Sequence, residues 1–240
     1  MDKGVIFYTD NRLGRLVREH MLPGLVMDSI KASGLPVVSC SLKQLDFGTN
    51  IVLNKEPGVI TYYHQILTAL RASTARYVFF CEHDVLYHPS HFEFTPPRDD
   101  TFYYNVNVWR CHPRQNVCVT YEHLRSVSGM CANRELAVEH YERRLDYCYD
   151  QGYDKIPRTK NPRWARVMGY EPGKSPRNGG FSVDKIDEWR STLPNIDIRH
   201  RLTMTIPKLK KDQFRHEPKD WQEKTIDQIE GWNIRKMFNL

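Results

Sequence analysis

Three polar residues follow an apolar run of the chain: Glu82, His83 and Asp84 come directly after the letters YVFFC. Ionised carboxylates at the end of a buried strand cost free energy unless a positive group pairs with them. A hard divalent cation such as Mg²⁺ or Mn²⁺ takes one or two protein carboxylates and fills its other positions with phosphate oxygens and water. Two acids separated by one residue therefore predict a site for a metal ion and a diphosphate.

A second polar group follows the first predicted strand. Residues 4–9, GVIFYT, form a short apolar run that stops at Asp10 and Asn11. In open α/β sheets, ligands bind beyond the carboxyl ends of the strands, so we expect this group and Glu82 to Asp84 to face a common cleft. Capping of the following helix explains Asp10 and Asn11 equally well.

Strand and helix patterns alternate through the first half of the chain. Apolar strands are predicted over 4–9, 35–41, 50–54 and 76–81, and helices from about residue 13 and over 58–73. Strand, helix and strand in this order predict an α/β fold, with a mixed, mainly parallel, Rossmann-like sheet flanked by helices.

The pattern changes after Pro96 and Pro97. Antiparallel or mixed strands are predicted over 101–111 and 116–123, an amphipathic helix over 132–150, long loops over 151–180, and one or two outer helices over 220–238. We read the whole chain as a single domain.

The composition is that of an ordinary globular protein, with 40% hydrophobic and 27% charged residues, and excludes a disordered chain. No apolar run approaches the roughly 20 residues of a membrane span, and the N-terminus has no signal-segment pattern, so we expect a cytoplasmic protein. The six cysteines contain no C-x-x-C pair, which predicts reduced thiols in or near the core.

The formal net charge of +6 leaves room for a polyanionic partner. Basic residues gather over 157–166, 172–180 and 199–216. Each run is read either as a solvated surface or as an anion-binding face.

The strand followed by Glu82, His83 and Asp84 resembles the D-x-D element of nucleotide-sugar glycosyltransferases of the GT-A fold. More narrowly, residues 60–94 and the letters PNIDIRH at 194–200 look like a group of glycosyltransferases common in phage and environmental sequences. The resemblance covers residues 4 to about 205. This chain departs from the motif in having Glu as the first acid and His as the middle residue.

The resemblance implies a nucleoside-diphosphate sugar donor, with a UDP-sugar expected, and Mn²⁺ or Mg²⁺ on its phosphates. Asp84 would bind the metal directly, Glu82 would contact the ribose or a metal-bound water, and His200 would be the late ligand. The residues implied to hold the donor are Thr9, Asp10, Asn11, Arg12, Gln65, Glu82, His83 and Lys208. A satisfied structural histidine is the alternative for His200.

Displacing a nucleoside diphosphate builds negative charge on the leaving phosphate, which a cation and basic side chains stabilise. The basic residues Lys208, Lys210, Lys211 and Arg215 are predicted to form a mobile lid. An inverting reaction also needs a general base, for which the candidates are Glu171, in the loop GYEPGKS, and Asp187, in a predicted helix. We favour Glu171, while retaining chemistry would need neither.

His83, His88 and His91 lie close together in the sequence and raise the question of a zinc site. Histidines clustered in a loop more often form hydrogen bonds, so we do not predict zinc here.

The acceptor is less well defined by the sequence. We slightly favour a hydroxylated base in phage DNA, such as 5-hydroxymethylcytosine, which would place the enzyme in the host cytoplasm. A surface polysaccharide or small glycan is the alternative. A nucleotidyltransferase would need a glycine-rich phosphate loop where this chain has YTDNRLG, and a non-enzymatic nucleic-acid-binding protein would leave Glu82 and Asp84 unexplained.

The single domain 1–240 then divides into a nucleotide-binding half over 1–95, an acceptor half over 96–205, and a C-terminal lid with helices over 206–240.

Overall fold

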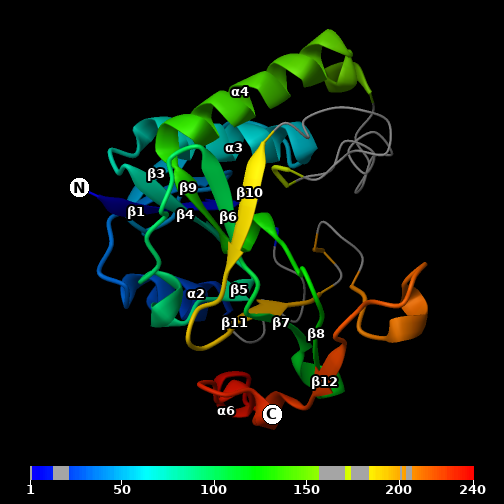
Figure 1. Cartoon of the computed structure of the whole chain (residues 1–240). Coiled ribbons are helices and arrows are strands. Elements are labelled where there is room, and N and C mark those ends of the chain that lie inside the picture. Colours follow the sequence, from blue (N-terminus) through cyan, green and yellow to red (C-terminus); the bar gives the residue numbers. More distant parts are fainter. Residues whose placement is uncertain (1, 13–21, 157–170, 174–183, 201, 204–206) are drawn as a thin grey trace.

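The computed structural model of the chain describes residues 2–12, 22–156, 171–173, 184–200, 202–203 and 207–240, which form two β-sheets and the helices around them (Figure 1). The larger sheet has the strand order β10-β6-β9-β4-β1-β2-β3. Its strands are β1 (Lys3–Thr9), β2 (Val37–Ser41), β3 (Thr49–Val52), β4 (Tyr77–Glu82), β6 (Thr101–Asn105), β9 (Met130–Asn133) and β10 (Lys185–Trp189).

The smaller sheet has the strand order β12-β8-β7-β11-β5. Its strands are β5 (Val85–Leu86), β7 (Val108–His112), β8 (Val117–Thr120), β11 (Asn195–Ile198) and β12 (Gln222–Lys224). The α-helices are α2 (Leu22–Lys31), α3 (Val59–Ala72), α4 (Arg134–Asp150) and α6 (Ile234–Met237). Within the described ranges, no helix has both the length and the apolar character that crossing a bilayer would require.

The larger sheet is mixed and mainly parallel, which confirms the predicted fold class. β1 pairs in parallel with both β2 and β4, β2 with β3, and β6 with β10, whereas β9 is antiparallel to β4 and β6. In the register of β1 and β4, Tyr8 lies opposite Glu82. The loops that follow these two strands therefore leave the sheet side by side, at the point where the winding of the sheet reverses.

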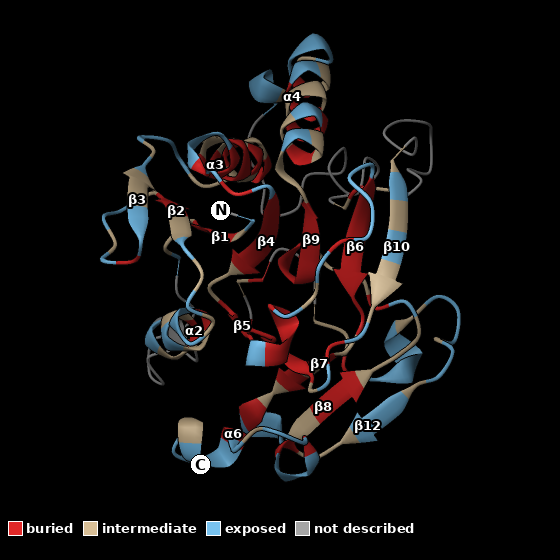
Figure 2. Ribbon diagram, turned by 60° about the vertical axis from the view of Figure 1, so that its left-hand side comes forward, coloured by how far each residue is buried: buried red, intermediate tan, exposed pale blue. Residues whose placement is uncertain are grey.

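Strand alternation divides the side chains of the larger sheet between two cores. In Figure 2, α3 and α4 lie on one side of this sheet, and α2 and the smaller sheet lie on the other. The helix-side core, which includes Ile6, Val78 and Phe80, packs against α3 and α4. The sheet-side core, which includes Phe7 and Phe79, packs against α2, the smaller sheet and the C-terminal residues. The same alternation directs Glu82, the last residue of β4, toward α3, and it directs the next residue, His83, toward the smaller sheet.

A buried polar network joins the two helices of the helix-side core. Arg144, which is 1% exposed, donates from Nε to Nε2 of His140 at 3.1 Å and from Nη1 to the Tyr63 hydroxyl at 3.2 Å. A buried charge is tolerated only when it has such partners. This contact fixes α4 against α3, the helix that begins at the candidate site.

Three predicted elements are corrected by the structure. The predicted strand segment 101–111 holds two strands, β6 and β7, and these belong to different sheets. Residues 185–189 form the edge strand β10 where we predicted a helix around Asp187, since their backbone pairs with β6 over its full length. The segment 220–238 contains the strand β12 and only the short helix α6.

The prediction of six reduced cysteines is wrong for two of them. Cys111 and Cys118 are joined by a disulfide. They lie directly opposite each other in the antiparallel pair of β7 and β8, with their Cα atoms 4.1 Å apart. Sequence spacing alone does not reveal this pairing, because the register of the two strands creates it. The other four cysteines are buried free thiols.

Gly48 offers a test of the loop between β2 and β3. Its φ is +61°, and a Cβ at this position would lie 2.3 Å from the carbonyl oxygen of Val37. We expect Gly48→Ala to lower the free energy of unfolding by about 2–4 kcal/mol, because the left-handed backbone and the clash with Val37 add together. Urea unfolding measures this loss.

Gly24 in α2 is the matched control, because a Cβ there would meet no atom within 4 Å. Gly24→Ala should leave the stability unchanged or raise it by up to about 1 kcal/mol, as alanine favours helix. Equal stability of Gly48→Ala and the wild-type protein would refute the expectation.

Candidate functional site

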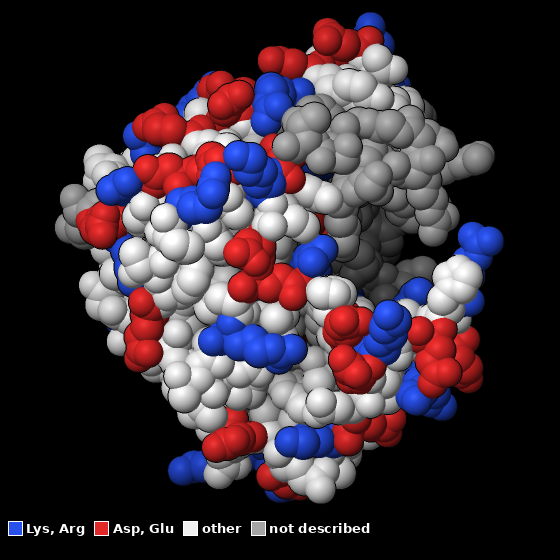
Figure 3. Space-filling view, viewed as in Figure 1, with Lys and Arg blue, Asp and Glu red and all other residues white. Residues whose placement is uncertain are grey.

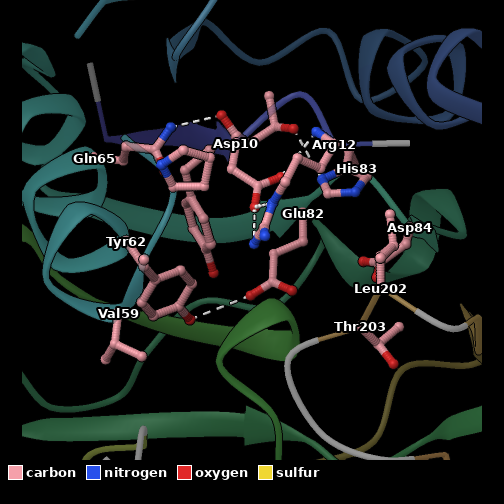
Figure 4. Close-up of a pocket in the computed structure, with 14 residues that line it drawn as sticks. Asp10, Arg12, Val59, Tyr62, Gln65, Glu82, His83, Asp84, Leu202 and Thr203 are labelled. Atoms are coloured by element: carbon pink, nitrogen blue, oxygen red, sulfur yellow. Dashed lines mark hydrogen bonds and ion pairs between the residues drawn. The ribbon is translucent and has the colours of Figure 1, made fainter. Parts of the chain in front are cut away.

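A cavity of about 300 Å³ opens where β1 and β4 end and α3 begins (Figure 4). Its lining comes from four segments and comprises Tyr8, Thr9, Asp10, Arg12, Pro57, Gly58, Val59, Tyr62, Gln65, Glu82, His83, Asp84, Leu202 and Thr203. The first turn of α3 carries no acidic residue, and its N-cap, Gly58, supplies no side-chain hydrogen bond. The N–H groups at this end of the helix therefore favour an anion in the cavity.

The loop after β1 contributes Thr9, Asp10 and Arg12 to the cavity wall, as the predicted donor site requires. The Arg12 guanidinium donates from Nε to Oδ2 of Asp10 at 2.6 Å. Asn11 is not among the lining residues: its Oδ1 accepts hydrogen bonds from the backbone N–H groups of Leu42, at 2.7 Å, and Lys43, at 2.9 Å. Asn11, at a φ of +57°, thus ties the β1 loop to the segment after β2.

Gln65 lines the cavity, but its amide nitrogen is already engaged. Nε2 donates to the carbonyl oxygens of Thr9, at 2.6 Å, and Cys40, at 3.3 Å. Gln65 therefore holds the ends of β1 and β2 together, which supports the cavity from behind.

In Figure 4 the side chain of Glu82 extends toward Tyr62, a residue of α3. The Tyr62 hydroxyl donates to Glu82 Oε1 at 3.2 Å. Burial raises the pKa of Glu82 to about 8, and the negative charge of Asp84 adds to the rise.

Asp84 is buried at the turn between β4 and β5, where its carbonyl oxygen accepts from the Ile198 N–H of β11 at 2.8 Å. Its Oδ2 lies 3.3 Å from Nε2 of His200. Burial would raise the pKa of Asp84, but the interaction with His200 and the attraction of His83 outweigh it and lower the pKa to about 2. Asp84 is therefore ionised at neutral pH.

His83, Asp84 and His200 form a cluster that could hold a metal ion, with one ligand atom from each lying within 4.8 Å of the others. The Nε2 atom of His83 is buried and has no hydrogen-bond partner among the described residues, whereas Nε2 of His200 faces Asp84 Oδ2. The donor set and the unpartnered nitrogen of His83 fit a divalent cation. This cluster shares Asp84 and His200 with the predicted metal site, and its third member is His83. Glu82, predicted to contact the ribose or a metal-bound water, lies on the α3 side of β4 beside Tyr62.

A smaller cavity of about 70 Å³ adjoins the first and shares Tyr62, Glu82, Asp84 and Thr203 with it. Its other lining residues are Val85, Arg110, Ser126, Val127, Ser128, Glu171, Asp197 and Arg199. Asp197 accepts from Arg199 Nη1 at 3.1 Å and lies 3.3 Å from Arg110 Nε. Sequence reasoning missed this ion cluster, although the letters PNIDIRH contain both Asp197 and Arg199.

The two predicted general bases are placed differently. Glu171 lines the smaller cavity, beside Glu82 and Asp84. Asp187 is exposed on the edge strand β10 and lines neither cavity, because its Oδ1 accepts from the backbone N–H of Glu188 at the rim of the sheet. Of the two carboxylates, only Glu171 can meet a ligand in the site.

Lys208 also lines neither cavity. Its ammonium lies 4.6 Å from the centroid of the Phe214 ring, and Lys211 pairs with Glu217 at 2.8 Å. The predicted lid over 206–240 is therefore not closed on the site in this structure.

The three basic runs of the sequence are only partly described by the structure. Figure 3 shows Lys and Arg side chains interspersed with Asp and Glu on the face it presents. The run 157–166 and most of 172–180 lie outside the described residues. Arg199 and His200, at the start of the third run, are buried in the site itself.

His88 and His91 belong to the short 3₁₀ turn after β5 and are not members of this cluster. His88 Nδ1 accepts from Ser90 N at 3.2 Å. His91 is fully buried, and its Nδ1 accepts from the amide nitrogens of Asn105 and Asn195, at 3.0 and 3.1 Å. Two donors facing Nδ1 keep this imidazole neutral.

His91 should make the stability fall in acid. Burial lowers its pKa to about 3, below the value of about 6.5 expected in the unfolded chain. Below pH 6.5 the His91 imidazole therefore binds a proton in the unfolded chain and stays unprotonated in the folded protein. Stability is lost at about 1.4 kcal/mol per pH unit until pH 3 is reached. Urea unfolding at pH 7 and pH 5 measures the slope.

His91→Gln is the informative variant, because it removes the titrating group and keeps an acceptor for Asn105. Its stability should fall less than that of the wild type between pH 7 and pH 5, by about 2 kcal/mol. Parallel losses in the two proteins would show that His91 does not titrate as described.

No protein-family model and no curated protein matches the chain. Among solved structures it is similar to a glycosyltransferase involved in glycosylation of the major capsid of PBCV-1, with 8% identity, coverage of 79% of this chain and 82% of that one, and a TM-score of 0.41. A variant of Drosophila β1,4-galactosyltransferase 7, in complex with manganese, UDP-Gal and xylobiose, gives 12% identity, 77% and 69% coverage, and a TM-score of 0.35. The apo form of the glycosyltransferase GlyE of Streptococcus pneumoniae gives 10% identity, coverage of 65% of this chain and 40% of that one, and a TM-score of 0.32. These likenesses are too distant to assign a function, which must come from the site.

Proposed function

We propose that this chain is a metal-dependent glycosyltransferase, which moves a sugar from a nucleoside-diphosphate donor to a hydroxyl acceptor. The larger cavity is the donor site in this proposal, and the smaller cavity takes the acceptor. The observation that carries the proposal is the cluster of His83, Asp84 and His200, in which the buried Nε2 atom of His83 has no described hydrogen-bond partner and Asp84 lines both cavities.

Three features of the larger cavity support a diphosphate ligand. A divalent cation held by the cluster would neutralise phosphate charge, the start of α3 offers N–H groups to an anion, and Arg12 lies on the wall. The volume of about 300 Å³ is in the range of small-molecule pockets. When bound, the cation would stabilise the negative charge of the leaving diphosphate.

Glu171 is the general base in this proposal, since it lines the acceptor cavity close to the cluster. Its carboxylate would accept the proton of the acceptor hydroxyl during attack on the sugar. Arg199 and Arg110 are held by Asp197 and set the charge around that position.

The smaller cavity suits a sugar hydroxyl better than DNA. Its polar lining includes Glu171, Ser126 and Ser128, which can form hydrogen bonds to a carbohydrate, and its arginines already face Asp197. A DNA backbone would meet the carboxylates of this cavity, which repel phosphates. The slight preference for a hydroxylated DNA base is not supported by these residues, and a glycan acceptor replaces it.

The chain acts as one domain in this proposal. The sheet-side core supports this, because it joins residues of β1, β7, β11 and the C-terminal segment. Most of the larger cavity comes from residues before 95, and most residues particular to the smaller cavity come from 110–199. The lid over 206–240 stays a prediction.

Thermal shift tests the donor site. The protein is heated with UDP-, GDP-, CDP- and TDP-sugars, each with and without Mn²⁺, and with uridine as a control that lacks the diphosphate. A ligand at 100 times its Kd stabilises the folded state by about 2.7 kcal/mol, which raises the Tm by several degrees. We expect such a rise for one nucleotide sugar with Mn²⁺ and none for uridine. If no nucleotide raises the Tm with or without metal, the proposal fails.

The acceptor is tested next with the donor that binds. Release of nucleoside diphosphate is compared for a panel of mono- and disaccharides, hydroxymethylated DNA and plain DNA. Stimulation by a saccharide alone supports the glycan acceptor, and stimulation by hydroxymethylated DNA alone overturns it.

A further inference from the structure

His83 occupies a position that sequence reasoning gave to donor binding, yet its side chain faces the cluster. The alternation of β4 sends Glu82 to the α3 side and His83 to the side of the smaller sheet. There its ring centroid lies 6.3 Å from that of His200. The two histidines thus meet beside Asp84, His83 from the turn after β4 and His200 from the segment after β11.

The orientation of His83 is fixed by Thr9. Nδ1 of His83 lies 2.9 Å from Thr9 Oγ1, which also accepts from the Asn11 N–H at 3.0 Å. A hydroxyl oxygen has two acceptor lone pairs, so it can take both N–H groups. The contact is thus compatible with the tautomer that carries its proton on Nδ1, which is the form that metal binding through the buried Nε2 requires. Metal-binding histidines characteristically donate their other ring N–H to an oxygen in this way.

The hydrogen bonds of His200 favour the tautomer that cannot bind a metal ion through Nε2. Its Nδ1 accepts from the Leu202 N–H at 3.2 Å, so Nε2 carries the proton and directs it toward Asp84. To bind an ion through Nε2, His200 must move that proton to Nδ1 and give up the Leu202 contact. The Leu202 hydrogen bond therefore opposes the metal-binding tautomer of His200, whereas the contact of His83 with Thr9 is compatible with it.

The donor set also selects the ion. Mg²⁺ is bound almost entirely by oxygen and keeps several waters, whereas Mn²⁺, Co²⁺ and Zn²⁺ accept imidazole nitrogen. One carboxylate and two imidazoles are enough to hold such an ion without any ligand from a nucleotide. Three protein atoms leave other coordination positions of a six-coordinate ion open to phosphate oxygens and water.

We infer that His83 is a third protein ligand, and that it makes the ion a resident of the free protein, chosen from the imidazole-accepting divalent metals over Mg²⁺. The inference rests on the metal site of the proposed function, but it concerns the ion before any nucleotide binds. Thr9 is a positioning residue in this arrangement, since its hydroxyl contacts Nδ1 of His83 and would act on the ion only through that ring.

Calorimetric titration of the full chain, after dialysis against a chelator, tests the inference with no nucleotide present. We expect the wild type to bind one Mn²⁺ per chain and to bind Mg²⁺ far more weakly. His83→Gln should lower the Mn²⁺ affinity about tenfold to hundredfold and leave the weak Mg²⁺ binding nearly unchanged. Thr9→Val should have a smaller effect in the same direction. His216→Ala, at an exposed histidine, is the matched control and should bind Mn²⁺ like the wild type.

Pulsed electron paramagnetic resonance of wild-type protein loaded with Mn²⁺ gives a second measurement that does not depend on a variant folding. Two coupled imidazole nitrogens are expected, and a single one would overturn the inference. So would wild-type Mn²⁺ affinity in a folded His83→Gln. If Mn²⁺ binds through His83 but no nucleotide sugar raises the Tm, only the proposed function fails. If turnover requires Mn²⁺ while His83→Gln keeps full affinity, only this inference fails.

Discussion

Replacement of Asp84 by Asn is expected to lower the rate of donor turnover by about 10²–10³-fold. Asn keeps the shape of the side chain and an oxygen that faces His200, so the fold should persist. What it loses is the negative charge at the centre of the cluster, on the only carboxylate among the three clustered residues. Without it the cation is held weakly and cannot stabilise the charge of the leaving diphosphate.

The measurement is release of nucleoside diphosphate from the donor that thermal shift identifies. Asp150→Asn, at an exposed aspartate at the end of α4, is the control and should keep the wild-type rate. The Tm of both variants in chelator should match that of the wild type closely enough to show a folded protein. A wild-type rate in Asp84→Asn would remove the cluster from the reaction.

Replacement of Glu171 by Gln is expected to lower kcat for transfer to the acceptor by about 10²–10⁴-fold. Glu171 lines only the smaller cavity, so the KM for the donor and the thermal shift with donor and Mn²⁺ should not change. This split between kcat and donor KM is what separates a base acting on the acceptor from a residue that binds the donor.

Asp187→Asn is the matched control, since Asp187 was the other general base predicted from the sequence. Its position on the exposed edge of the larger sheet leads us to expect the wild-type rate. Loss of activity in Asp187→Asn, with Glu171→Gln unaffected, would reverse the assignment. Full activity in both variants would show that neither carboxylate takes the acceptor proton.

The first half of the fold could be read from the sequence because its signals are local. The apolar runs that became β1 and β4 end at polar residues, and the stripe containing Tyr63, Ile66 and Leu70 marks the buried face of α3. Each of these patterns is complete within one segment. The adjacency of the loops after β1 and β4 then followed from the general behaviour of parallel sheets.

The features that could not be predicted from the sequence depend on strands that come together only in the folded chain. Glu82 and His83 are neighbours in the sequence, and which of them faces the cluster is decided by the side on which the smaller sheet packs. The disulfide depends on the register of β7 and β8, and the role of Asn11 depends on where the segment after β2 passes. The short strand β10 looked helical because its pairing with β6 carries no local signature.

The chain passes from the larger sheet to the smaller one at the cluster, because the turn after β4 leads into β5, which pairs with β11, and the Ile198 N–H donates to the Asp84 carbonyl. His83 and Asp84 lead out of one layer, and His200 arrives from the other. A cation bound here would cross-link the two layers. On heating, dissociation of the cation should be the first change at this junction, before either sheet unfolds.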